Sequence, residues 1–331
     1  MQMLLFTRFL VLVGLCALQI ICSSANAQQK VRIGVLKFGT VNWELNTIKR
    51  NKFDKAQGID LEIVHFASTQ ASRFALQAGK LDVIVSDWLW VSRQRANGKL
   101  LAFVPYSSSV GSLMVMSSSP VKTLADLKGK KIGIAGGPVD KSWLLIRGLA
   151  KRDFGIDLKH ETEQVFGAPP LLYKKALQGE LDAVINYWHY SARLEANGFR
   201  RVIGADDAAK LLGAEGRISA LGYVFSENWA EKNRNAAMGF VTASSSAKKL
   251  LASSDEEWDR LRELTKAKDD KTFEVLKLRF REGIPKRSLA EEQRDAAKIY
   301  DILAKIGGEK LVGAASNLIK GTYWTVLTDG S

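Results

Sequence analysis

At 331 residues, 46% of them hydrophobic, the chain is long enough to bury one large core or two ordinary ones. Its formal charge of +13 at pH 7 would attract anionic ligands, lipid headgroups or nucleic acid, although basic and acidic residues are interleaved as on an ordinary solvated surface. The three histidines, His65, His160 and His189, have no HExxH or comparable spacing, so a zinc site is not expected.

The N-terminus has the features of a secretory signal. Arg8 is followed by an apolar run at 9–21 and by an A-x-A pattern that ends at Ala27. A membrane anchor is the alternative, but the run is well short of the roughly 20 residues that a spanning helix needs. We therefore expect a signal peptide at 1–27 and a periplasmic protein that does not meet nucleic acid. Cleavage would remove both cysteines, Cys16 and Cys22, and with them any disulfide or thiol chemistry.

Strands and helices are expected to alternate through the exported chain. Apolar, β-rich runs predict strands at 31–38, 59–66, 81–85, 100–106 and 112–117. Helices are expected at about 43–56 and in the alanine-rich stretch that ends at 78. The alternation restarts with strands expected at 131–135, 162–166, 181–185 and 220–225, and with helices at 141–154 and from Pro169 to Gln178. Beyond Trp229 the sequence is helical to about 306, with a break at 283–285.

An internal repeat divides this α/β pattern into two similar parts. Residues 79–98, GKLDVIVSDWLWVSRQRANG, and residues 179–198, GELDAVINYWHYSARLEANG, are identical at eight of twenty positions. Average residue usage would give roughly one identity by chance. The fold class expected is α/β, with two similar lobes of open β-sheets flanked by helices and a ligand cleft between them. Lobe one is expected at 28–115 and 222–331, and lobe two at 116–221.

The expected site follows from a rule about open α/β sheets, in which ligands bind beyond the carboxyl ends of the strands. The rule selects the loops at 37–43, 68–70, 86–88, 136–143 and 186–188. Trp88 and Trp188 would then face one another across the cleft, where aromatic walls suit a planar or cationic ligand. The alternative is that each tryptophan only packs its own lobe.

No catalytic constellation accompanies these loops. Asp82 and Asp182 begin their strands at the end away from the cleft, where a turn or capping role is expected. Glu44, Asp87 and Asp140 lie nearer the cleft, but no histidine accompanies them at a telling spacing, and the G-x-S-x-G and Walker signatures are absent. We therefore expect a protein that is not an enzyme and has no cofactor or metal.

Four stretches resemble the periplasmic solute-binding proteins of ABC importers, in the nitrate, sulfonate and taurine group that also contains thiamine-precursor binding proteins. They are ALQAGKLDVIVSD at 75–87, KTLADLKGKKIGIAGGPVDKSWLLIRGLAKRDFGID at 122–157, GAPPLLYKKALQGELDAVINYW at 167–188 and GYVFSENWAEKN at 222–233. The resemblance implies the type II periplasmic-binding fold and a monomer that closes on a small-molecule ligand. It also implies delivery of that ligand to an ABC permease and its ATPase in the inner membrane.

Carried over by position, the resemblance also implies a set of ligand contacts. They are Phe38, Gly39, Asn42, Trp43, Ser68, Thr69, Ser86, Asp87, Trp88, Gly137, Asp140, Asn186 and Trp188. The sequences DWLW and YWHY are more aromatic and acidic than expected for binders of small anions, which favours a larger, ring-bearing or partly cationic ligand. The net charge favours an anion, and a zwitterion would satisfy both indications.

Two other functions are compatible with the same sequence features. The first is an enzyme on the same fold, as in pyrimidine-precursor synthases, which the missing thiol and the scattered histidines disfavour. The second is a sensor or accessory protein that presents its ligand to another periplasmic partner instead of an importer.

Overall fold

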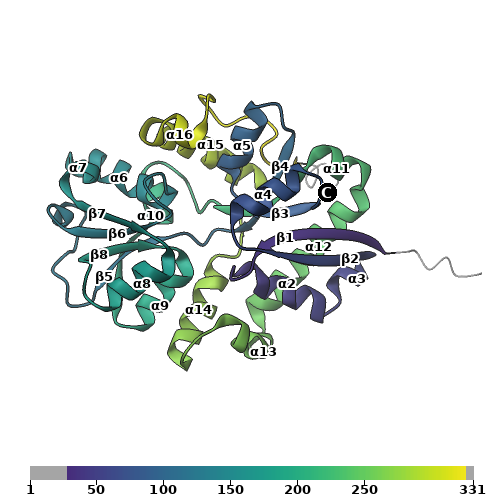
Figure 1. Ribbon diagram of the computed structural model, residues 1–331, viewed down its shortest axis with the longest axis horizontal. Coiled ribbons are helices and arrows are strands. Elements are labelled where there is room, and N and C mark those ends of the chain that lie inside the picture. Colours follow the sequence, from purple (N-terminus) through teal and green to yellow (C-terminus); the bar gives the residue numbers. More distant parts are fainter. Residues whose placement is uncertain (1–27, 326–331) are drawn as a thin grey trace, which may run out of the picture.

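Two five-stranded sheets organise residues 28–325, the part of the chain that the computed structural model describes (Figure 1). The signal peptide expected at 1–27 lies outside the described residues. The first sheet has the order β2-β1-β3-β10-β4 and the second has the order β7-β6-β8-β5-β9. In each sheet four strands run in one direction, and the fourth in the order is antiparallel to both of its neighbours. The two similar α/β lobes that the repeat predicts are confirmed.

The strands lie close to their expected positions. Those of the first sheet are β1 (Gln29–Leu36), β2 (Ile59–Phe66), β3 (Val83–Ser86), β4 (Leu101–Ser107) and β10 (Leu221–Ser226). Those of the second sheet are β5 (Ser112–Met116), β6 (Lys131–Ala135), β7 (Glu163–Gly167), β8 (Ala183–Asn186) and β9 (Phe199–Gly204). We call the parts of the chain built round these sheets the first and second lobe. The expected boundary at 115/116 falls inside β5, which pairs with β8 and β9 and so belongs to the second sheet.

Helices cover both faces of each sheet (Figure 1). Around the first sheet they are α2 (Val41–Arg50), α3 (Phe53–Ala56), α4 (Thr69–Gln77), α5 (Trp88–Ala96), α11 (Glu227–Lys232), α12 (Arg234–Ser253) and α13 (Asp255–Thr265). Around the second sheet they are the short 3-10 turn η1 (Ala125–Leu127), α6 (Lys141–Phe154), α7 (Leu158–Glu161), α8 (Pro169–Leu177), α9 (Trp188–Ala196) and α10 (Ala205–Leu211). Within residues 28–325 we find no helix whose length and apolar character would let it cross a membrane.

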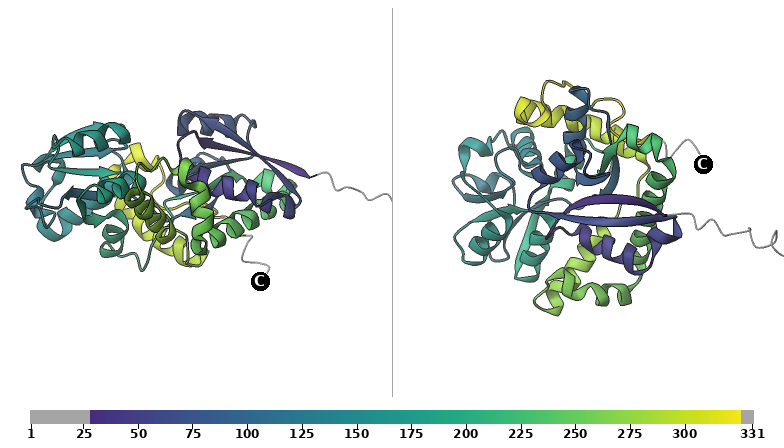
Figure 2. Two further views of the ribbon diagram at one scale, coloured as in Figure 1. Left: turned by 90° about the horizontal axis from the view of Figure 1, so that it is seen from below. Right: turned by 45° about the vertical axis from the view of Figure 1, so that its right-hand side comes forward.

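The C-terminal helices contact both lobes. They are α14 (Asp270–Glu282), α15 (Leu289–Gly307) and α16 (Glu309–Val312). α14 packs on α9 and α15 packs on α6, both in the second lobe, whereas α16 returns to α5 of the first. Figure 2 shows these helices, in yellow-green and yellow, between the teal second lobe and the purple and blue first lobe. The segment 222–331, expected in lobe one, therefore also braces lobe two.

Three elements differ from expectation for identifiable reasons. The helix expected at 43–56 is divided into α2 and α3, because Lys52 between them adopts a left-handed conformation with φ of 56°. β9 was not expected, since its sequence FRRVIG places two arginines at the centre of an edge strand. α10 was not expected either, and it is only seven residues long.

Asp82 and Asp182 hold the same place in the two lobes, at the strand ends away from the cleft. Oδ2 of Asp82 accepts a hydrogen bond from the amide of Arg32 at 2.8 Å, and Oδ2 of Asp182 accepts one from the amide of Lys131 at 2.8 Å. Each aspartate directly precedes its strand, β3 or β8, and its side chain ties that strand to the neighbouring parallel strand, β1 or β6. The expected turn or capping role is refined to a tie between strands.

Candidate ligand-binding site

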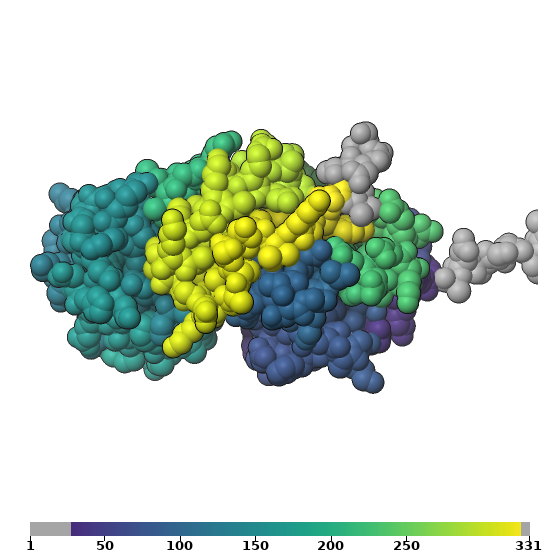
Figure 3. Space-filling model, turned by 90° about the horizontal axis from the view of Figure 1, so that it is seen from above, coloured from purple at the N-terminus to yellow at the C-terminus, as the bar shows by residue number. Residues whose placement is uncertain are grey.

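A cavity of about 510 Å³ lies between the lobes and takes its walls from both. Its first-lobe wall is formed by the ends of β1 and β3 and the beginnings of α4 and α5. The beginnings of α6 and α9, together with α10, form the second-lobe wall. α15 and α16 add to the cavity wall, and Figure 3 shows these C-terminal helices, in yellow, spanning the gap between the lobes. This volume lies in the range typical of pockets for small organic molecules.

Two of the helices that begin at the cavity carry an aspartate as N-cap residue. Asp87 follows β3, and its Oδ1 accepts a hydrogen bond from the amide of Trp90 at 2.9 Å. Asp140 precedes α6, and its Oδ1 accepts one from the amide of Trp143 at 3.1 Å. Aspartate is among the preferred N-cap residues, which explains why both helices begin where they do. The caps also bring one carboxylate from each lobe to the cavity.

Asp87 is the centre of a charged group that joins the lobes. The guanidinium of Arg73, on α4, donates to Asp87 Oδ2 at 3.0 Å and to Ser86 Oγ at 2.8 Å, and its Cζ lies 4.5 Å from the Trp90 ring centroid. From the second lobe, Nζ of Lys141 lies 3.5 Å from the same Oδ2. An ion pair therefore crosses the cavity from one lobe to the other.

The ionisation of these groups follows from their surroundings. Burial alone would raise the pKa of Asp87, but the cations of Lys141 and Arg73 outweigh it and hold the pKa below its ordinary 3.8. Asp140 has a raised pKa because its burial outweighs the attraction of Lys141. Burial, together with nearby Arg193, lowers the pKa of His189 to about 3. His189 is therefore neutral at pH 7 and would be a weak general base.

Trp88 and Trp188 both line the cavity, and both also pack against other aromatic rings. Trp88 is only 4% exposed, and its ring centroid lies 6.5 Å from that of Tyr300 on α15. Trp188 is half-buried and stands edge-on to Trp43, with centroids 5.8 Å apart. The two roles that the sequence left open, cavity wall and packing, thus coexist in each tryptophan.

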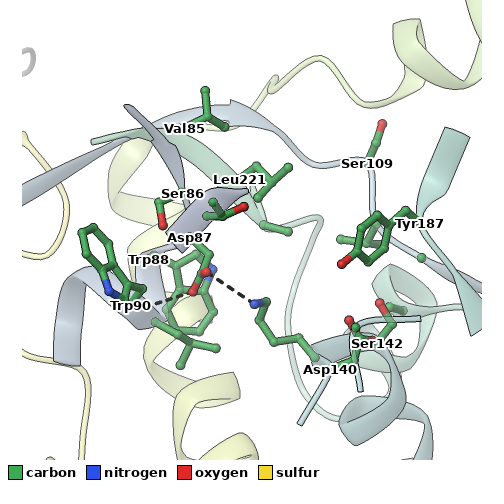
Figure 4. A pocket seen from close by; sticks show the side chains of 18 of the residues that line it. Val85, Ser86, Asp87, Trp88, Trp90, Ser109, Asp140, Ser142, Tyr187 and Leu221 are labelled. Carbon is green, nitrogen blue, oxygen red and sulfur yellow. Dashed lines mark hydrogen bonds and ion pairs between the residues drawn. The ribbon is translucent and has the colours of Figure 1, made fainter. Parts of the chain in front are cut away.

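Seven of the thirteen expected contact residues line this one cavity. They are Gly39, Thr69, Ser86, Asp87, Trp88, Asp140 and Trp188. Figure 4 shows Ser86, Asp87 and Trp88 on one side and Asp140 on the other.

The other six expected residues are not part of the cavity wall: Phe38, Asn42, Trp43, Ser68, Gly137 and Asn186. Phe38 is 85% exposed on the outside of its loop, and Gly137 forms a turn with φ of +83°. Trp43 is buried against Trp258, and Ser68 uses its hydroxyl to cap α4.

Both expected asparagines bind backbone instead of facing the cavity. Asn42 donates to the carbonyls of Leu36 and Gly39 at 2.9 and 2.8 Å, and so holds the loop after β1 in place. Asn186 is buried and donates to the carbonyl of Pro169 at 3.0 Å, which ties β8 to the beginning of α8. In this structure both amides are therefore engaged with backbone outside the cavity wall.

The cavity wall also contains residues that the strand-end rule does not single out. Arg73 lies one turn after Thr69 on the same helix face, a spacing that could have indicated it. Lys141 and Tyr187 lie in two loops that the strand-end rule selects, 136–143 and 186–188, but neither residue is among the expected contacts. The apolar wall from the second lobe and the C-terminal helices has no polar signal in the sequence; it includes Leu145, Ala209, Ile299, Leu303 and Leu311.

Metal-ligating side chains do not gather in this region. Across the residues that the structure describes, no three His, Cys, Asp or Glu side chains are grouped so that they could hold a metal ion. The cavity is therefore characterised by its ion pair, its aromatic rings and its apolar wall.

Two α/β lobes with a cavity between them are the arrangement of the class of periplasmic solute-binding proteins. The periplasmic aliphatic sulphonate binding protein SsuA from Escherichia coli matches with a TM-score of 0.69 and 20% identity, over 89% of this chain and 92% of that one. The alkanesulfonate-binding protein SsuA from Xanthomonas axonopodis pv. citri, bound to MOPS, matches with a TM-score of 0.65 and 16% identity, over 89% of this chain and 98% of that one. At these identities the likeness establishes the fold.

Residues 49–257 match the family described as NMT1/THI5 like, and the chain belongs to that family. The expected resemblance to solute-binding proteins is thereby confirmed at the level of family and fold. Over 171 residues the chain is also 26% identical to an ATP phosphoribosyltransferase from Desulfatibacillum aliphaticivorans. That match covers 49% of this chain and 53% of the relative. This chain therefore spans about half the length of the relative.

Proposed function

We propose that the protein is an extracytoplasmic solute-binding protein that captures a small organic ligand between its lobes and delivers it to an ABC permease with its ATPase. The observation that carries the proposal is the cavity of about 510 Å³ whose walls come from both lobes. A ligand that touches both walls stabilises the closed arrangement over an open one by its differential binding energy. Release to a permease then requires the lobes to separate.

The structural neighbours support this direction. Besides the two sulfonate-binding proteins, the periplasmic nitrate-binding protein NrtA from Synechocystis has the same fold, with a TM-score of 0.52 and 12% identity over 75% of this chain. We propose a periplasmic location after removal of residues 1–27, a monomer, and binding without catalysis or cofactor. The proposed ligand contacts are Gly39, Thr69, Ser86, Asp87, Trp88, Asp140 and Trp188.

Thermal unfolding of the protein beginning at Gln28 tests the proposal. The panel contains sulfonates, aromatic acids, pyrimidines and amines. A ligand at 100 times its dissociation constant stabilises the folded state by about 2.7 kcal/mol, which raises the Tm by several degrees. A response to one chemical class identifies the ligand class.

A matched pair of variants assigns the response to the cavity. Thr69→Trp places a large ring in the cavity wall, whereas Gln70→Trp adds the same ring at the next, exposed position outside that wall. We expect the ligand-induced shift to persist in Gln70→Trp and to vanish in Thr69→Trp. An equal shift in both variants, or no shift with any class of compound, would contradict the proposal.

A further inference from the structure

The cavity differs from an ordinary anion site in what occupies two of its helix N-termini, those of α5 and α6. Free amide groups and the helix dipole make an N-terminus attractive to anions. Here the carboxylates of Asp87 and Asp140 already accept from the amides of Trp90 and Trp143 at the beginnings of α5 and α6. An anionic ligand group at either helix would meet a carboxylate of the protein itself.

Asp87 has one fixed and one exchangeable cationic partner. Arg73 is held in place by Ser86 and Trp90 as well as by Asp87, so it is part of the first-lobe wall. Lys141 reaches Asp87 from the second lobe, and among the described residues its ammonium lies within ion-pair distance of Asp87 alone. Its side chain is partly exposed and flexible, so a ligand can displace the ammonium without disturbing the core.

Asp140 is engaged as the N-cap of α6, where it accepts from the amide of Trp143, and the other charged groups of the wall are engaged or exposed. The guanidinium of Arg93 donates to the carbonyls of Lys310 and Leu311, both at 3.4 Å. Asp206 pairs with Arg217 at 3.0 Å, and Lys310 is exposed at the surface. The ion pair of Asp87 with Lys141 is therefore the place where a ligand charge can enter by exchange.

We infer, resting on the proposed binding function of this cavity, that the ligand carries a basic group, an amine or an amidine, that takes the place of the Lys141 ammonium at Asp87. The Lys141 ammonium acts as the protein's own substitute for that group. The body of the ligand lies against Trp88 and the apolar wall of Leu145, Ile299 and Leu303, where burial and cation–π attraction favour a basic, ring-bearing molecule.

The test compares probes that share a ring and differ in the charge of the attached group: benzylamine and benzamidine against benzenesulfonate and benzoate. Calorimetric titration is done with wild type, Lys141→Met, Asp87→Asn and the control Lys151→Met, which removes an exposed lysine from the same helix outside the cavity. Methionine keeps the length of the side chain and removes the competing charge.

We expect Lys141→Met to bind benzylamine and benzamidine at least about tenfold more tightly than wild type, because the competing ammonium is gone. Lys151→Met should match wild type, and Asp87→Asn, which keeps a good N-cap, should lose the amine affinity. Equal amine affinity of wild type and Lys141→Met overturns the inference. So does binding of benzenesulfonate or benzoate that weakens in Lys141→Met, and in that case the proposed binding function stands while the basic ligand is excluded.

Discussion

Replacing Lys248 by methionine should destabilise the first lobe severely, because it isolates a buried carboxylate. Glu44, on α2, is 0% exposed. Its Oε1 accepts from the hydroxyls of Tyr223 at 2.7 Å and Ser244 at 2.6 Å and from Nζ of Lys248 at 2.9 Å, and the same Nζ lies 2.8 Å from Oε2. Without Lys248 the carboxylate keeps only two neutral donors in a site that excludes water.

The expected magnitude follows from the burial of this pair. Removing one partner of a buried ion pair costs about 3–5 kcal/mol, because the remaining charge is uncompensated. Removing both charges, in Glu44→Gln with Lys248→Met, should cost clearly less, since an amide can still accept from the two hydroxyls. The coupling between the two substitutions should therefore be favourable and amount to about 2 kcal/mol or more.

Urea unfolding at pH 7 of wild type, both single variants and the double variant measures this coupling. Lys249→Met is the matched control, since Lys249 is the next residue on α12 and is exposed. We expect the control to stay within about 0.5 kcal/mol of wild type. A Lys248→Met variant that is as stable as the control, or a double variant no more stable than that single variant, would refute the reasoning.

Two further predictions concern packing and pH. In Gly222→Ala the new Cβ would overlap the Phe103 ring and the Val104 carbonyl. We therefore expect the free energy of unfolding in urea to fall by about 1–3 kcal/mol. A decrease below about 0.5 kcal/mol would contradict the packing described. Burial would raise the pKa of Asp295, but its hydrogen bond from Arg287 and those from the amides of Glu215 and Gly216 outweigh burial and hold the pKa below the ordinary 3.8. The resulting stabilisation is complete above the ordinary pKa and is lost as pH falls through the lower folded-state value. Asp295→Asn should therefore be less stable than wild type at pH 7 and should lose less stability than wild type on acidification. If the free energies of unfolding of the two proteins fall in parallel from pH 7 to pH 3, the prediction is wrong.

The sequence predicts the fold well because its signals are local. The repeat at 79–98 and 179–198 marks equivalent strand–helix units. The strand-end rule then predicts that Ser86, Asp87 and Trp88 lie at the cavity, and they do. The rule selects loops, however, and cannot decide which side chain of a loop turns inward. Phe38 lies on the outside of its turn, and Asn42 binds the backbone of its own loop.

The apolar wall could not be predicted for a different reason. Ile299 and Leu303 lie on an amphipathic helix whose sequence shows that one face is buried but not against which lobe. Only the tertiary arrangement, in which α15 packs on α6, places that face at the cavity. Contacts between segments far apart in the chain carry no signal in a single sequence.

The antiparallel strands have a consequence for the order in which the protein can assemble. β5 to β9 are consecutive in the chain, so the second sheet can close without any strand from outside residues 112–204. The first sheet needs β10, where Gly222 pairs with Ser86 and Pro105, and β3 and β4 must wait for it. Because such distant pairing is slow, the second sheet, built from the middle of the chain, should form first and the first sheet, with its N-terminal strands, last. A chain that ends before residue 221 would leave the facing edges of β3 and β4 unpaired.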